Sequence, residues 1–240
     1  MRLLPILSCL LTVLLVSCGG SSGGDTTPTS PAVETTSPQA QQTAEAAIPD
    51  PFASLNSYNY DVEVLADGQL HFGIKGSVQA PDRIAMDFFV SSSVGPIESV
   101  IIIGSQAWAK ASSTENQWAA TDLGSARGIV AGGQPKDIWN VLPVDQLTSQ
   151  ANDLGEENVN GVASHHFQST NLTSDTKSIL ANFFGFGVDS GTIDVWRADD
   201  GGWPVKAQVT AKFPSGEQIS TGETDWQVSN VNSVVLQPPQ

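Results

Sequence analysis

Apolar and polar side chains alternate along several segments of this chain. From residue 58 to residue 64, tyrosine and valine occupy the even positions, while asparagine, aspartate and glutamate occupy the odd ones. Successive side chains of a strand point to opposite faces of a sheet, so this period of two predicts a half-buried strand. The pattern returns over 70–78 and 84–90, and Asp67-Gly68 between the first two segments predicts a hairpin. Sequential strands joined by short turns predict an antiparallel meander.

Six further segments have strand-like patterns. They cover residues 99–103, 106–111, 162–170, 191–198, 203–213 and 217–229. In the last of these, Ile219 falls at an odd position and Trp226 at an even one, so we expect a β-bulge near Gly222. The loop Asp199-Asp200-Gly201-Gly202 predicts a hairpin connection and not a calcium site, because the alternating acids and the later glutamate of a calcium loop are missing.

Two segments in the middle of the chain predict helices. Asp137 is a suitable N-cap for one or two short helices within 135–151. A longer helix is expected over Ser174–Phe184, with its cap at 173 or 174 and Gly185 just past its end. The apolar residues of this second helix form a stripe at helical spacing, which usually packs onto a sheet. Together with the strands, these helices predict a mainly β fold with inserted helices, of the α+β class.

The N-terminal segment has the features of an export signal. A basic residue precedes an apolar run over residues 3–16, and a small residue leads to Cys18. The end of the run, Leu15-Val16-Ser17-Cys18, resembles the bacterial lipobox, in which a peptidase cuts before a cysteine whose thiol carries diacylglycerol. The alternative is a retained transmembrane anchor, but the run is shorter than the roughly 20 apolar residues that cross a bilayer. We expect residues 1–17 to be a lipoprotein signal peptide and Cys18 to be the lipid anchor.

The segment that follows predicts a tether. Residues 18–50 are mainly Gly, Ser, Thr, Pro, Ala and Gln, and they bury too little apolar surface to offset the entropy of ordering. Residues 51–240 then form one domain. Its core must hold without cross-links, because Cys9 lies in the signal peptide and Cys18 would carry lipid. The formal net charge of −15 argues against nucleic acid and anionic membrane surfaces as partners, so the lipid on Cys18 must provide the membrane attachment.

Patterns that would indicate an enzyme or a metal site are weak. The chain has three histidines, and the adjacent His165 and His166 point to opposite faces of a strand, so they cannot hold one metal together. The sequence contains neither an HExxH run nor a phosphate-binding glycine loop followed by lysine. Glu156 and Glu157 are interpreted as solvated charges and not as an acid–base pair. We expect no catalytic residues, no metal and no cofactor, and so a protein that is not an enzyme.

Three short stretches resemble one family. Residues 80–86 place a proline and a basic residue before an apolar strand, residues 160–167 hold a glycine followed by histidines, and residues 194–206 form a tryptophan-containing hairpin. Together with the order of lipobox, tether, strands, inserted helices and closing strands, they resemble the LolA-like superfamily of lipoprotein carriers, nearest the LppX/LprAFG branch of lipid-binding bacterial lipoproteins. The resemblance implies a curved antiparallel half-barrel with helices over its concave face and an apolar cavity for acyl chains.

By this resemblance, the chain would be an exported lipoprotein of the cell membrane or cell envelope that binds or carries lipid or another acylated molecule. The candidate cavity residues are Phe72, Ile74, Met86, Phe88, Ile179, Leu180, Phe183 and Phe184. The same side chains could instead fill a solid core. In that alternative, the chain is a structural or interaction lipoprotein of the envelope with no ligand and with a protein partner that the sequence does not identify.

Overall fold

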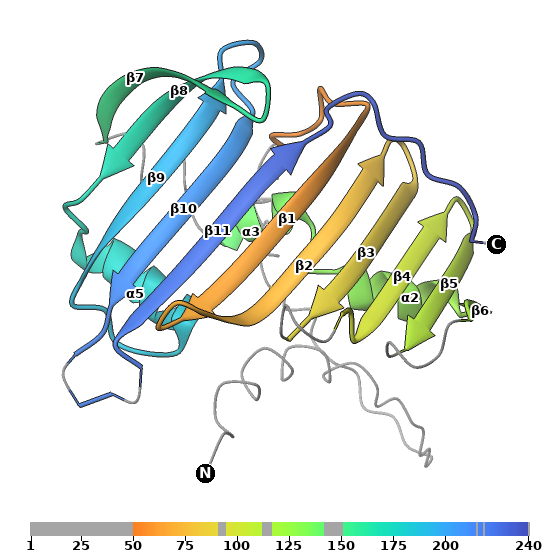
Figure 1. Ribbon diagram of the computed structural model, residues 1–240, viewed down its shortest axis with the longest axis horizontal. Helices are drawn as coiled ribbons and strands as arrows, with labels where there is room; N and C mark the ends of the chain where they lie inside the picture. The colour runs from red at the N-terminus through yellow and green to blue at the C-terminus, as the bar shows by residue number, and fades with distance from the viewer. Residues whose placement is uncertain are drawn as a thin grey trace, which may run out of the picture. The chain divides into compact units, whose positions relative to one another are not determined.

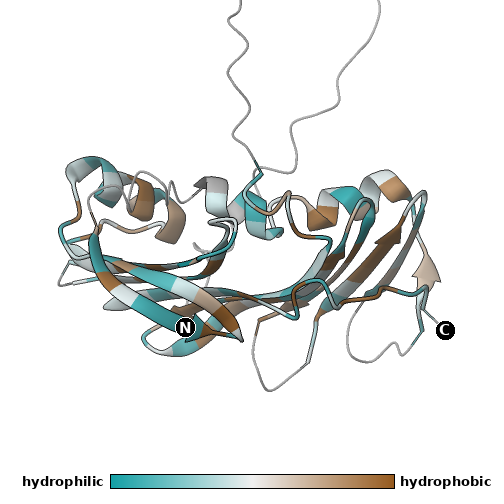
Figure 2. Ribbon diagram, turned by 90° about the horizontal axis from the view of Figure 1, so that it is seen from above, coloured by the Kyte–Doolittle hydropathy of each residue, from teal (hydrophilic) through white to brown (hydrophobic). Residues whose placement is uncertain are grey.

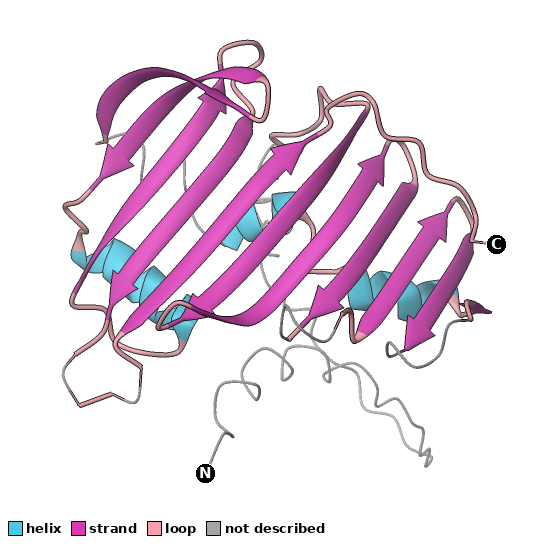
Figure 3. Ribbon diagram, in the orientation of Figure 1, coloured by secondary structure: helices cyan, strands magenta, loops and turns pink. Residues whose placement is uncertain are grey.

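One antiparallel sheet of eleven strands runs through the whole folded part of the chain (Figures 1 and 3). The computed structural model describes residues 50–90, 95–111, 117–141, 151–214, 216–217 and 219–239. The expected signal peptide, Cys18 and the tether up to residue 49 lie outside the described residues. Within the described ranges, no helix combines the length and the hydropathy needed to span a bilayer.

The strand order in the sheet is β6-β5-β4-β3-β2-β1-β11-β10-β9-β8-β7. Strands β1 to β6 therefore form one half of the sheet and strands β7 to β11 the other, and the two halves join where β1 pairs with β11. The strands are β1 (Ser57–Ala66), β2 (Gln69–Gln79), β3 (Arg83–Phe89), β4 (Glu98–Ile103), β5 (Gln106–Ala111), β6 (Ala119–Ala120), β7 (Asn152–Val159), β8 (Val162–Ser169), β9 (Ser190–Ala198), β10 (Pro204–Lys212) and β11 (Thr221–Ser229). The sheet stays open, because β6 and β7 are separate edges and do not pair with each other.

Three helices cover one side of this sheet, as Figure 2 shows. They are α2 (Leu123–Val130), α3 (Pro135–Val141) and α5 (Ser174–Phe184). We call the side of the sheet under these helices the inner face and the opposite side the outer face. Even-numbered residues of β1, such as Tyr60 and Val62, lie on the inner face, and odd-numbered ones such as Asp61 lie on the outer face. The predicted fold class, a mainly β half-barrel with inserted helices on one face, is confirmed.

Helix α5 begins and ends where the sequence predicts. The Thr173 side chain accepts a hydrogen bond from the backbone N–H of Thr176 at 3.2 Å, and Gly185 ends the helix in the left-handed conformation with φ of 77°. The expected hairpin between β1 and β2 also forms. Asp67 and Gly68 both have positive φ, of 48° and 74°, as a tight two-residue hairpin turn requires.

Two local predictions are wrong, and two elements were not predicted. The expected β-bulge near Gly222 is absent, since the pairing of β10 with β11 shows no register shift there. Strand β11 begins only at Thr221, so Ile219 lies before the strand and its side chain does not have to share a face with Trp226. Asp137 does not cap α3, which begins at Pro135; its carboxylate instead accepts from the N–H of Gly132 at 3.3 Å. The polar edge strand β7 and the helix α2, which contains two glycines, were not predicted, since neither carries a clear apolar period.

Candidate functional site

Aromatic side chains gather on the inner face where β1 meets β11. The Trp226 ring of β11 lies 5.8 Å from Trp139 of α3 and 5.6 Å from Phe52, measured between ring centroids. Phe52 also lies 5.5 Å from Tyr58 of β1. All four side chains are buried. This aromatic cluster fixes α3 and the segment before β1 onto the central strands.

Three polar atoms in the same region are buried without a hydrogen-bond partner. They are the Tyr60 hydroxyl, the Thr224 hydroxyl and the indole nitrogen of Trp226. Each parent residue is only 2 % exposed, so water does not reach these atoms. A buried polar atom without a partner costs about 1–3 kcal/mol, which makes three of them on two neighbouring strands a feature that needs an explanation.

The pairing of β1 with β11 brings these three polar groups together. Val62 is opposite Trp226, while Tyr60 is opposite Val228 and Val64 is opposite Thr224. The three side chains therefore occupy successive positions along one short stretch of the inner face. Burial raises the pKa of Tyr60 well above 10.0, and it also raises the pKa of Tyr58. Both hydroxyls therefore keep their protons at neutral pH and can donate to an acceptor.

The candidate residues on β2 and β3 also lie on the inner face. Ile74 and Met86 are 3 % and 2 % exposed, and a Cβ at Gly133, in the segment between α2 and α3, would lie 3.0–3.2 Å from atoms of both side chains. Phe72 and Phe88 are half-buried, with their ring centroids 6.2 Å apart. The segment before α3 therefore packs directly on this part of the sheet, and a side chain at 133 would require Met86 and Ile74 to shift by a few tenths of an ångström.

The candidate residues on α5 lie against β10 and β11. Leu180 is fully buried, and the Phe184 ring lies 5.6 Å from Phe213 and 5.0 Å from Phe183. Seven of the eight predicted residues belong to, or pack against, one continuous hydrophobic core. Ile179, which is only partly buried on α5, is outside that core. That these residues line a ligand cavity stays a prediction.

A polar network occupies the outer face at the other end of the sheet. Both ring nitrogens of His166 on β8 face carboxylates: Nδ1 lies 3.0 Å from Glu157 and Nε2 lies 2.8 Å from Asp194. The His166 ring stacks on Trp196, with centroids 4.1 Å apart, and the Trp196 indole donates to Glu157 at 2.8 Å. This hydrogen bond from Trp196, followed by the one from His166, lowers the pKa of Glu157.

The network bears on two predictions. Glu157 is solvated as expected, with 48 % of its side chain exposed, but it lies on β7 and also joins this edge strand to β8 and β9 through His166 and Trp196. His165 and His166 do point to opposite faces, as expected: His165 contacts Asp199 at 3.0 Å and not the partners of His166. Among the described residues, no three histidine, cysteine or acidic side chains are arranged to hold a metal ion.

The unpartnered polar atoms of the inner face were not predicted. The alternation that identifies β1 and β11 places Tyr60, Thr224 and Trp226 on a buried face, so the signal for their burial was present. It could not show that the three side chains share one stretch of that face, because more than 160 residues separate Tyr60 from Thr224 along the chain. Nor could it show that they lack partners.

Comparison with known proteins gives matches among solved structures. No family model matches the chain, and no curated protein matches it in sequence. Similar structures include lipoprotein LppX from Mycobacterium tuberculosis, with 16% identity over 78% of this chain and 92% of that one and a TM-score of 0.43. LprF from Mycobacterium bovis has 15% identity over 78% and 90% of the two chains and a TM-score of 0.48.

A LolA superfamily protein from Nitrosomonas europaea is also similar, with 11% identity over 75% of this chain and 86% of that one and a TM-score of 0.26. At these identities, the likeness is one of fold.

Proposed function

We propose that this chain is an exported, lipid-anchored protein that binds an acylated molecule between the inner face of its sheet and the helices. The observation that carries the proposal is the set of three unpartnered polar atoms of Tyr60, Thr224 and Trp226, surrounded by aromatic and aliphatic side chains. An ester or carboxyl group bears oxygens that can accept from a hydroxyl and an indole N–H, while its acyl chain requires apolar surroundings.

The helix layer can make room for such a molecule more easily than the sheet can. Each strand is hydrogen-bonded along both sides except at the edges, whereas α3 and α5 are held to the sheet by side-chain packing, including the contact of Trp139 with Trp226. Displacing a helix therefore breaks few hydrogen bonds. An acyl chain that enters beneath it replaces apolar contacts with similar ones, and its ester or carboxyl group can partner the adjacent Tyr60 hydroxyl and Trp226 indole.

The anchor follows from the lipobox-like residues before Cys18 and from the charge of the chain. A formal charge of −15 repels anionic headgroups, so a covalent lipid is the means of attachment that the sequence supports. We expect Cys18→Ala to abolish lipid modification, measured by incorporation of a labelled fatty acid, and to move the protein out of the membrane fraction. Unchanged labelling in this variant would contradict the assigned anchor.

The ligand can be tested on the full chain purified in a polyoxyethylene detergent. Organic extraction removes molecules that are held non-covalently and leaves any lipid on Cys18 attached, so mass spectrometry of the extract reports only the ligand. We expect acylated molecules in the extract and uptake of a fluorescent fatty acid by the stripped protein. An empty extract without uptake would overturn the proposal and would favour the filled-core alternative, an envelope protein that acts through a protein partner.

A pair of matched variants tests the role of the polar atoms. Tyr60→Phe removes a buried hydroxyl that has no partner, so we expect unchanged or increased stability and roughly three- to tenfold weaker uptake of the fatty acid. Tyr58→Phe is the control, because the Tyr58 hydroxyl is not among the buried unpartnered atoms. Equal effects of the two substitutions on uptake would show that the Tyr60 hydroxyl does not contact the ligand.

A further inference from the structure

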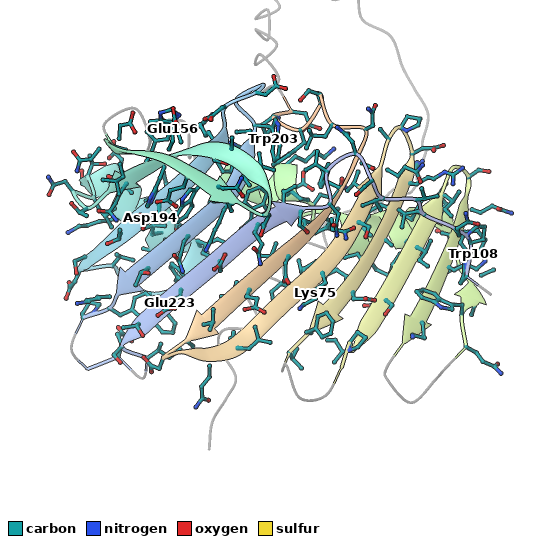
Figure 4. The ribbon with its side chains drawn as sticks, turned by 45° about the horizontal axis from the view of Figure 1, so that its top comes forward. Lys75, Trp108, Glu156, Asp194, Trp203 and Glu223 are labelled. Atoms are coloured by element: carbon teal, nitrogen blue, oxygen red, sulfur yellow. The ribbon has the colours of Figure 1, made fainter. Side chains whose placement is uncertain are left out.

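The outer face carries a pocket that is lined mainly by residues outside the proposed lipid site, although it also borders Tyr60 and Met86. Its volume is about 480 Å³, and it lies over β1 to β4, around the Lys75 side chain labelled in Figure 4. Asn160, in the turn between β7 and β8, forms part of its wall. This turn reaches across β9 and β10, because the Asn160 amide donates to Gln227 at 3.2 Å and to the backbone oxygen of Val228 at 2.9 Å on β11.

Hydrogen-bonding groups of several kinds line this outer pocket. The Ser77 hydroxyl donates to the amide oxygen of Asn59 at 2.8 Å, and the Lys75 ammonium lies 3.2 Å from one carboxylate oxygen of Asp61. The second carboxylate oxygen of Asp61 is buried without a partner. Asp87 adds another carboxylate to the lining. The pocket thus offers amide, hydroxyl, carboxylate and ammonium groups.

The balance of charge in the pocket excludes anionic ligands. Among the lining residues, Asp61 and Asp87 carry two negative charges against one positive charge on Lys75, which is already paired with Asp61, and the ammonium of nearby Lys110 is directed to the Trp118 ring. A phosphate or a carboxylate would therefore be repelled. A hydroxyl group fits better, since it can donate to a carboxylate and accept from an amide or ammonium group without bringing a charge of its own.

An aromatic wall completes the pocket. Trp118 lies at its edge, beside β6, and Lys110 stands 5.3 Å from the centroid of its ring. Indole rings provide an apolar surface with a polar tip, which suits molecules that have one hydroxylated side and one C–H side. We propose that the outer pocket binds a neutral carbohydrate, with a sugar ring against Trp118 and its hydroxyls hydrogen-bonded to Asn59, Asp61 and Lys75.

Titration of the full chain with neutral oligosaccharides of glucose, galactose and mannose tests this inference. The polyoxyethylene detergent carries no sugar, so it does not compete. We expect saturation-transfer NMR to show binding of at least one oligosaccharide, with Trp118→Ala weakening it about tenfold. Glucose 6-phosphate should bind more weakly than glucose.

Trp108→Ala is the matched control, because Trp108 also lies on the outer face but is not part of the pocket lining. Asn59→Ala is a second pocket variant, in case Trp118→Ala unfolds the protein. Loss of sugar binding in both pocket variants and retention in the control would support the inference. The inference would be overturned if no neutral oligosaccharide bound, or if Trp108→Ala weakened binding as much as Trp118→Ala. It would also be overturned if the cationic peptide pentalysine, titrated in parallel, bound and the oligosaccharides did not. Fatty-acid uptake should be the same in all three variants, so this test is independent of the lipid site.

Discussion

The contact between α5 and the sheet depends on the absence of a side chain at Gly222. A Cβ atom placed there would lie 2.8 Å from the Phe213 ring and 2.9 Å from the Phe184 ring. Both distances are about half an ångström shorter than the ordinary van der Waals contact distance between two non-bonded carbon atoms. The two rings contact each other, with centroids 5.6 Å apart, and Phe213 also lies 5.3 Å from Phe186, so neither ring can move freely. Gly222→Ala therefore has to push α5 away from β11.

The expected cost follows from two opposing effects. Overpacking a core by one methyl group costs about 1–3 kcal/mol, whereas alanine in a strand gains about 0.5–1 kcal/mol over glycine. We expect Gly222→Ala to lower the free energy of unfolding by about 1–2 kcal/mol. The melting temperature should fall by roughly 2–8 °C for a folded unit of this size.

Urea unfolding followed by tryptophan fluorescence measures this difference. Gly73→Ala is the matched control, because Gly73 also lies within a strand but its Cβ would meet only ordinary contacts of 3.4–3.8 Å. The control should leave stability unchanged or raise it. Combining Gly222→Ala with Phe184→Leu should cost less than the sum of the single changes. Full stability of Gly222→Ala, or strict additivity in the double variant, would refute this account of how α5 is seated.

Three further predictions concern titration and the polar network. The chain has only two tyrosines, Tyr58 and Tyr60, and burial raises the pKa of both above 10.0. Because the unfolded chain ionises them first, stability should fall as the pH rises above 10.0, and native tyrosinate absorbance near pH 10.0 would contradict this. His166→Phe keeps an aromatic ring against Trp196 but loses the hydrogen bonds to Glu157 and Asp194. Urea unfolding should therefore show a free energy of unfolding about 1–3 kcal/mol lower than that of the wild type. An unchanged value would mean that the network does not stabilise the fold. The His165 ring donates a hydrogen bond to the Asp199 carboxylate, and this bond raises the pKa of His165 above 6.5. Its contribution to stability is therefore full below pH 6.5 and is lost at higher pH. Stability curves of the wild type and Asp199→Asn should therefore converge as the pH rises, and a constant difference would contradict that role.

Local patterns in the sequence predicted many of the secondary-structure elements. The alternation in 58–64 identified β1 and its buried face, and the capping residues around Ser174–Phe184 identified α5 to the residue. Both signals depend on neighbours within a few positions. The edge strand β7 was missed for the same reason, since most of its side chains are exposed on both faces and leave no period of two to detect.

The candidate site was predicted only in part. Apolar residues such as Met86 and Leu180 were correctly expected to be buried, because hydrophobicity and periodicity indicate which face of an element is covered. Glu157 shows the limit of this reasoning. Its polar surroundings indicated correctly that the carboxylate is exposed, but not that the fold places a histidine and an indole N–H beside it.

The sequence by itself determined most of the strands, their faces, the long helix and the lipobox-like segment, because each is encoded in adjacent residues. Only the tertiary structure decided that β1 and β11 pair, and so placed Tyr60 on the same stretch of the inner face as Trp226 and Thr224. The same pairing and the fold of the β7–β8 turn created the outer pocket. The physical reason is that the pairing of distant strands depends on the packing of the whole sheet, which no short stretch of sequence specifies.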